Sequence, residues 1–117
     1  MARKLPELSV FFPFWNEEEN IKEVISRALS VVPMVSDKWE IIMVDDGSSD
    51  RTLEIANSLV ASSENLRVVS LHPNRGYGAA LKAGFENSRY DYIVFTDGDL
   101  QFDLSEKIGR ASCRERV

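Results

Sequence analysis

Apolar segments alternate with segments of helical periodicity along this chain, and the alternation constrains its fold more than any other feature. Apolar and β-branched residues dominate four short runs that we expect to be strands, at 8–12, 39–44, 66–71 and 92–96. Three segments with helical spacing lie between them. Apolar strands that alternate with helices on short connections form parallel sheets covered by helices on both faces. With right-handed crossovers, the sequence predicts an α/β fold of Rossmann-like order β-α-β-α-β-α-β.

Two residues suggest the limits of the first expected helix. Asn16 is of a type that caps helix N-termini, and the glutamates at 17–19 suit the positive end of the helix dipole. Pro33 follows the last apolar positions, so we expect the helix to end before it.

Acidic and amide side chains gather where the expected strands end. Asn16 and Glu17 follow the first strand, Asp45 and Asp46 the second, and Asp97 and Asp99 the fourth, as the printed sequence shows. In open parallel sheets, ligands bind outside the carboxyl ends of the strands. The sequence therefore predicts a binding site that is shared by three strand ends.

Asp97 and Asp99 are separated by Gly98 directly after the fourth strand. Two like charges at the end of a buried strand are costly unless a positive charge compensates them, which favours a metal over a solvated turn. Oxygen ligands suit Mg²⁺ or Mn²⁺, which usually bridge carboxylates to substrate phosphates. An EF-hand is excluded, because Phe102 and Ile108 occupy the positions of its glycine and its bidentate glutamate.

The motif from Asp45 to Asp50 leaves two interpretations open. Asp, Ser and Gly are the residues that a strand-to-helix turn prefers, so the motif can be a capping turn. Its carboxylates can also accept hydrogen bonds from a base or a ribose. Gly76 and Gly78 suggest a dinucleotide fingerprint, but Leu81 replaces its third glycine. We therefore assign this segment, with Tyr77, to helix packing.

Composition narrows the class of protein. The chain has 117 residues, enough for one domain, and its net charge of −5 argues against a nucleic-acid partner. Its single cysteine, Cys113, excludes an internal disulfide and a cysteine-based zinc site. We expect neither a signal peptide nor a membrane span, because the apolar runs are short.

Residues 108–117 differ from the rest of the chain, with three arginines and no helical or strand periodicity. A common sequencing-library adapter, translated in one frame, encodes these ten residues in order. We interpret them as a non-native tail and residues 1–107 as the N-terminal part of a truncated domain.

Four motifs together resemble family 2 glycosyltransferases of the GT-A fold, most closely the polyprenyl-phosphate (dolichol-phosphate type) mannosyl- and glucosyltransferases. They are Pro13–Glu17, Val44–Thr52, Asn74–Gly76 and Asp97–Gln101. The resemblance runs from about Leu8 to Glu106. It implies that the fold is the nucleotide-sugar-binding half of a GT-A domain.

The resemblance also implies which residues meet the nucleotide. Pro13, Trp15 and Glu17 match positions that contact it, although the aromatic residue is often Tyr in the family. Asp45 matches the carboxylate that binds the base or the ribose. Asp46 supports Asp45, and Met43 lies near the same pocket.

In the fourth motif, Asp97 and Asp99 match the metal-binding D-x-D pair. Gln101 matches a further polar ligand of the metal. Gly98, which replaces a commoner alanine, lies beside the nucleotide sugar.

The implied activity is transfer of a hexose from a UDP- or GDP-hexose, with inversion and with Mg²⁺ or Mn²⁺. The acceptor is a polyprenyl phosphate or another lipid phosphate, or a glycan, as in cell-envelope glycan biosynthesis. The catalytic base lies beyond the matched region. We expect a cytoplasmic location or, for the full-length protein alone, membrane association at the cytoplasmic face.

Other classes also gather acidic residues around Mg²⁺. A receiver-type signalling domain would place its acidic pair after the first strand and a lysine after a fifth. A haloacid-type phosphatase would place D-x-D after its first strand and Thr at the position of Gln101. A catalytically inactive nucleotide-binding fragment is a further alternative.

Overall fold

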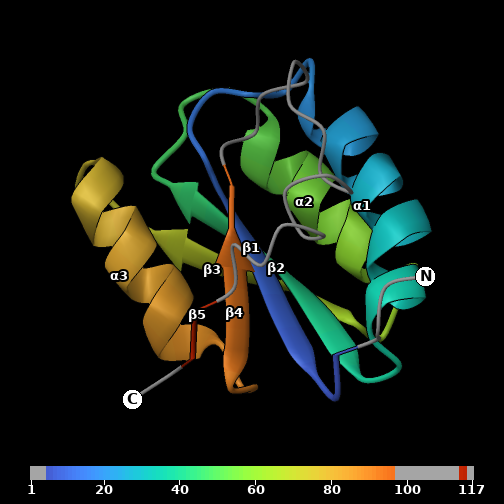
Figure 1. Ribbon diagram of the computed structural model, residues 1–117. Helices are drawn as coiled ribbons and strands as arrows, with labels where there is room; N and C mark the ends of the chain where they lie inside the picture. The colour runs from blue at the N-terminus through green and yellow to red at the C-terminus, as the bar shows by residue number, and fades with distance from the viewer. Residues whose placement is uncertain (1–4, 97–113, 116–117) are drawn as a thin grey trace.

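The computed structural model describes residues 5–96 and 114–115, which form a sheet with helices on both faces. The elements in chain order are β1 (Leu8–Phe14), α1 (Ile21–Val35), β2 (Trp39–Asp46), α2 (Thr52–Val60), β3 (Leu66–Leu71), α3 (Tyr77–Asn87), β4 (Tyr92–Phe95) and β5 (Arg114–Glu115). The strand order is β3-β2-β1-β4-β5, and β1 to β4 are parallel. The predicted α/β fold is confirmed (Figure 1).

The short strand β5 was not expected from the sequence. It pairs antiparallel with β4, with Tyr92 opposite Glu115 and Ile93 opposite Arg114. Backbone pairing at the edge of a sheet needs no particular side chains, so the sequence carries no periodic pattern from which such a strand could be predicted.

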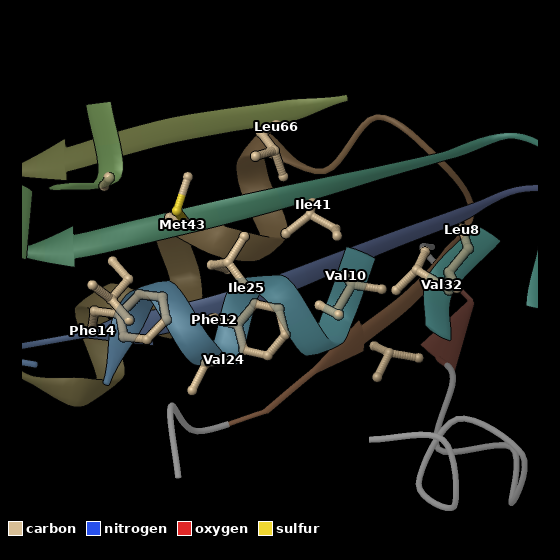
Figure 2. Packing of buried hydrophobic residues seen from close by; sticks show 14 residues of the cluster. Leu8, Val10, Phe12, Phe14, Val24, Ile25, Val32, Ile41, Met43 and Leu66 are labelled. Atoms are coloured by element: carbon tan, nitrogen blue, oxygen red, sulfur yellow. The ribbon is translucent and has the colours of Figure 1, made fainter. Parts of the chain in front are cut away.

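Side-chain alternation along the central strands divides the core into two layers. Phe12, Phe14 and Met43 face α1 and α2, whereas Phe11 and Ile42 face α3. Figure 2 shows the larger layer, in which Ile25 of α1 packs over β1 and β2. Because both faces are covered, β1 and β2 are apolar along most of their length, as the sequence predicted.

Helix α1 does not end before Pro33, contrary to expectation, but continues to Val35. Val35, which lies beyond Pro33, packs against the core layer that faces α1 and α2, so ending the helix before Pro33 would withdraw an apolar side chain from the core. The backbone N–H of Ser36 closes the last turn on Val32 O at 3.2 Å, and Leu5 N–H donates to Val35 O at 2.8 Å. Packing and these capping bonds therefore outweigh the hydrogen bond that proline lacks.

Among the described helices, none has the length and apolar character that crossing a membrane requires.

Candidate functional site

A cavity of about 350 Å³ opens at the carboxyl edge of the sheet, between the end of β1 and the start of α3. We call it the aromatic pocket; its lining residues are Pro13, Phe14, Trp15, Asp46, Asn74, Gly76, Tyr77 and Ala80. Trp15 and Tyr77 are 56% and 55% exposed. Large aromatic side chains that stay exposed beside a cavity offer faces on which a planar ligand can stack.

Among the described residues at this edge, Asp45 has a buried side-chain oxygen that lacks a hydrogen-bond partner. It is 2% exposed, and its Oδ2 accepts one long hydrogen bond, of 3.4 Å, from Ser48 N–H. Its Oδ1 is buried and has no partner among the described residues. A buried carboxylate oxygen without a donor is costly, so Asp45 is prepared to accept a hydrogen bond from a ligand.

Asp46 faces the opposite side of the sheet from Asp45, because successive side chains of a strand alternate. Its Oδ1 accepts Arg75 N–H at 2.8 Å, and its Oδ2 accepts Gly76 N–H at 3.0 Å. Asn74 Nδ2 donates to both Asp46 Oδ2, at 3.1 Å, and Asp46 O, at 2.8 Å. The two adjacent aspartates therefore have different environments. Both carboxylate oxygens of Asp46 accept hydrogen bonds from the loop, whereas Oδ1 of Asp45 accepts none from the described residues.

Asn16 was expected to cap α1, but that helix begins at Ile21 and Asn16 serves another loop. The Oδ1 of Asn16 accepts the backbone N–H groups of Ser49, at 2.8 Å, and Asp50, at 3.3 Å. In return, Ser48 Oγ accepts Asn16 N–H at 2.9 Å. Asn16 has a φ of 51°, a left-handed conformation that asparagine tolerates better than most residues.

Asp50 and Thr52 strengthen the same link between the β1–α1 and β2–α2 loops. Thr52 Oγ1 accepts Glu17 N–H at 2.8 Å, and Asp50 Oδ2 accepts Glu18 N–H at 3.3 Å. Desolvation opposes ionisation of Asp50, but hydrogen bonds from Thr52 and Glu18 outweigh it and lower the pKa of Asp50. Hydrogen bonds from the motif Asp45–Asp50 and from Thr52 therefore join the β1–α1 and β2–α2 loops at the carboxyl edge of the sheet.

Three of the expected nucleotide contacts, Glu17, Met43 and Asp45, are not among the residues that line the aromatic pocket. The Glu17 carboxylate accepts Asn20 Nδ2 at 3.2 Å and borders a separate polar hollow of about 210 Å³. Met43 is 0% exposed within the core layer that faces α1 and α2, which gives it a packing role (Figure 2). Pro13 and Trp15, by contrast, line the pocket.

The expected metal ligands Asp97, Asp99 and Gln101, together with Gly98, lie outside the described residues. Among the residues that are described, no group of three or more His, Cys, Asp or Glu side chains is placed to hold a metal ion.

Sequence reasoning missed Tyr77 as a pocket residue, because it assigned the segment around Gly76 to helix packing. The available signal was the Asn74–Gly76 motif, which was noted but given no role of its own. The structure brings this motif against Asp46, which makes it one wall of the pocket.

A family model, Glycosyl transferase family 2, matches residues 9–110. The chain belongs to this family. Membership decides against the receiver-type domain and the haloacid-type phosphatase, and it agrees with the order of the motifs at the strand ends.

Two curated relatives carry names that include a polyprenyl phosphate. The undecaprenyl-phosphate 4-deoxy-4-formamido-L-arabinose transferase of Pectobacterium carotovorum is 38% identical over 103 residues, which are 86% of this chain and 31% of the relative. The dodecaprenyl-phosphate galacturonate synthase of Rhizobium johnstonii is 40% identical over 111 residues, 94% of this chain and 33% of the relative. The chain therefore spans about a third of the length of these relatives.

Solved structures show the same architecture. TarS of S. aureus superposes with a TM-score of 0.69 at 28% identity, over 80% of this chain and 27% of that one. It has also been solved with UDP-GlcNAc. The mannosyltransferase PcManGT of Pyrobaculum calidifontis, solved with GDP-Man and Mn²⁺, has a TM-score of 0.76 at 24% identity, over 92% of this chain and 31% of that one.

Proposed function

We propose that this chain is the donor-binding part of a glycosyltransferase that transfers a hexose from a nucleoside-diphosphate sugar to polyprenyl phosphate. The proposal is carried by the buried Oδ1 of Asp45, which has no partner among the described residues and lies at the carboxyl edge of a family 2 fold. The names of the relatives support the lipid-phosphate acceptor, and the UDP-GlcNAc complex of TarS supports a nucleotide-sugar donor.

The nucleoside would bind through acceptor and stacking groups of the chain itself. Asp45 would accept a hydrogen bond from a base N–H or from a ribose hydroxyl. The exposed face of Trp15 would stack on the base, and Pro13 would border it from the end of β1. Base-aromatic stacking contributes about 1–3 kcal/mol, which matches the role of an exposed tryptophan at a pocket.

A divalent metal fits the chemistry of the donor set that follows β4. The two carboxylates of Asp97 and Asp99 and the amide oxygen of Gln101 are the hard oxygen ligands that Mg²⁺ or Mn²⁺ prefers. When bound, such an ion offsets the negative charge that develops on the diphosphate leaving group.

In the transfer itself, an oxygen of the acceptor phosphate attacks the anomeric carbon from the face opposite the diphosphate. The new carbon–oxygen bond forms as the bond to the diphosphate breaks, the nucleoside diphosphate leaves, and the anomeric configuration inverts. Because a polyprenyl phosphate is already an anion, its attack needs little help from a general base. The described residues act before this step by holding and orienting the nucleoside.

Replacing Asp45 by asparagine tests the nucleoside contact. The amide keeps the size but loses the charged acceptor, and a hydrogen bond to a charged group is worth about 1.5–3 kcal/mol, so the Kd for UDP or GDP should rise at least about tenfold. Isothermal titration with the 117-residue chain measures it. The control is Asp91→Asn, an exposed aspartate that directly precedes β4, at the other edge of the sheet.

A nucleotide panel separates the two roles that Asp45 can take. If it accepts from the base, the wild-type chain should prefer UDP over CDP, because N3 of uracil carries a hydrogen and N3 of cytosine does not. If it accepts from the ribose, 2′-deoxy-UDP should bind more weakly than UDP, and CDP should bind with the same affinity as UDP. Equal UDP affinity in the wild type and Asp45→Asn would remove Asp45 from the site.

Replacing Asp97 by alanine tests the metal. UDP should bind the wild type more tightly in Mg²⁺ or Mn²⁺ than in EDTA, and the variant should lose this gain, which we expect to be about tenfold or more. Titrations with and without the ion measure the difference, with Asp91→Ala as the control. A variant whose UDP affinity still responds to the ion would contradict the assignment of Asp97.

A further inference from the structure

The loop that forms one wall of the aromatic pocket is held by the last residue of β2, Asp46, and packs against the turn that follows it. Pro73 to Gly76 passes over this turn, and the Asp46 carboxylate, 5% exposed, accepts hydrogen bonds from Arg75 N–H, Gly76 N–H and Asn74 Nδ2. These donors lie 28 to 30 residues after Asp46 in the chain. The position of the loop therefore depends on contacts with β2 that the loop cannot supply itself.

Gly47, the next residue, permits the loop to come this close. A Cβ at position 47 would lie 2.4 Å from Asn74 N, 2.8 Å from Asn74 Cα and 3.0 Å from Pro73 C. All three are backbone atoms, which cannot rotate out of the way. Gly47 also has a φ of +68°, so a side chain here is strained by the backbone as well as by the contact.

Gly78 provides a contrast within the same region. A Cβ there would meet nothing within 4 Å. Close approach to the loop is therefore a property of Gly47 and not of this part of the chain in general.

We infer that Gly47 is a positioning residue for the nucleotide pocket, acting with Asp46 as a clamp on residues 73–76. Gly47 is not among the residues that line the pocket, whereas Asn74, Gly76 and Tyr77 are. The clamp sets how far the Tyr77 wall stands from Trp15, and so sets the width of the space between the two aromatic residues. This inference rests on the proposed function, because it treats the pocket as the site of the nucleotide.

A methyl group at position 47 would push the loop outward and lengthen the hydrogen bonds to Asp46. Two consequences follow. The amide hydrogens of Arg75 and Gly76 should exchange with solvent faster, because their acceptor has moved away. The Kd for UDP should rise, because one wall of the pocket has moved.

The test compares Gly47→Ala with Gly78→Ala in the 117-residue chain by two measurements. Hydrogen exchange followed by NMR should show Arg75 and Gly76 exchanging at least about tenfold faster in Gly47→Ala, with Met43 in the core still protected. Titration with UDP should show a Kd raised by about tenfold, the equivalent of about 1.4 kcal/mol. Gly78→Ala should change neither quantity.

The outcomes separate the clamp from the function. Unchanged exchange at Arg75 and Gly76 overturns the clamp, and faster exchange with an unchanged Kd overturns its role in positioning the pocket. If the wild type binds none of the four common nucleoside diphosphates, the proposed function fails while the exchange measurement still tests the clamp. Should Gly47→Ala fail to fold, Asp46→Asn, which keeps the size of the side chain, is expected to expose the same two amides.

Discussion

Replacing Glu40 by alanine should lower the free energy of unfolding by about 3 kcal/mol, because it removes one partner from a buried ionic network. Glu40 is 0% exposed. Its Oε2 accepts Ser9 Oγ–H at 2.6 Å and Arg89 N–H at 2.7 Å. Its Oε1 accepts the Nε–H groups of Arg67 and Arg89, both at 3.1 Å.

This network ties together the amino edge of the sheet, opposite the aromatic pocket. Ser9 lies on β1, Glu40 on β2 and Arg67 on β3, while Arg89 precedes β4. Ser9 Oγ accepts Tyr90 N–H at 3.1 Å, and Arg67 donates to the carbonyl of Asn87. Alanine at position 40 would leave the Ser9 hydroxyl and the Arg89 amide without their acceptor, which is the costly part of the change.

Urea denaturation of the wild type and Glu40→Ala measures the loss. The control is Glu54→Ala, whose ion pair with Arg51 has both side chains 67% exposed and should be worth less than about 1 kcal/mol. A loss for Glu40→Ala that does not exceed that of Glu54→Ala would contradict the central place given to this network.

The pH dependence of stability gives a second measurement of Glu40. Desolvation raises the pKa of Glu40, but hydrogen bonds from Arg89 and Ser9 and the charge of Arg67 lower it more, so the pKa lies below the usual value of 4.5. The carboxylate therefore stabilises the fold above pH 4.5, and this contribution is lost as the pH falls through that value toward the lower folded pKa. The wild type should lose more stability than Glu40→Gln over this acidic range.

The order of helices and strands could be predicted because it rests on local patterns. Apolar runs and helical spacing are complete within each segment, so β1 to β4 were found close to their observed positions and the three helices in the segments between them, although the limits of α1 were not. The buried network around Glu40 is a feature that such local patterns do not predict. Glu40 looked like one polar residue near the start of a strand, because its partners Arg67 and Arg89 lie 27 and 49 residues away.

The candidate site was predictable in its residue types but not in its hydrogen bonds. The strand ends identified Asp45 and Asp46, yet only tertiary contacts reveal that Asp46 has its acceptors filled while Asp45 does not. Asn16 was expected to cap the helix next to it, and it bonds instead to backbone groups 33 and 34 residues away. A side chain that can cap one helix can cap another loop equally well, and sequence spacing does not distinguish the two.

Replacing Gly84 by alanine should lower the free energy of unfolding by about 2 kcal/mol, although alanine is the better helix former. A Cβ at position 84 of α3 would lie 2.2 Å from both Cδ1 and Cε1 of Phe11. Phe11 is 0% exposed and is held between Phe85 and Phe95, with ring centroids at 5.1 and 5.5 Å. Because Phe11 is buried and a Cβ at position 84 would overlap its ring, either the ring or α3 must shift, and the cost of overpacking, about 1–3 kcal/mol or more, exceeds the gain of about 1 kcal/mol in helix propensity.

Thermal and urea unfolding should give opposite results for two glycines of the same helix. Gly78→Ala, which meets nothing within 4 Å, should be neutral or stabilising, whereas Gly84→Ala should be destabilising. A double-mutant cycle with Phe11→Leu then tests the cause, since the smaller side chain should recover part of the loss and make the two changes non-additive. If Gly84→Ala is as stable as Gly78→Ala, the ring of Phe11 moves freely and the close contact between β1 and α3 does not limit how the helix packs.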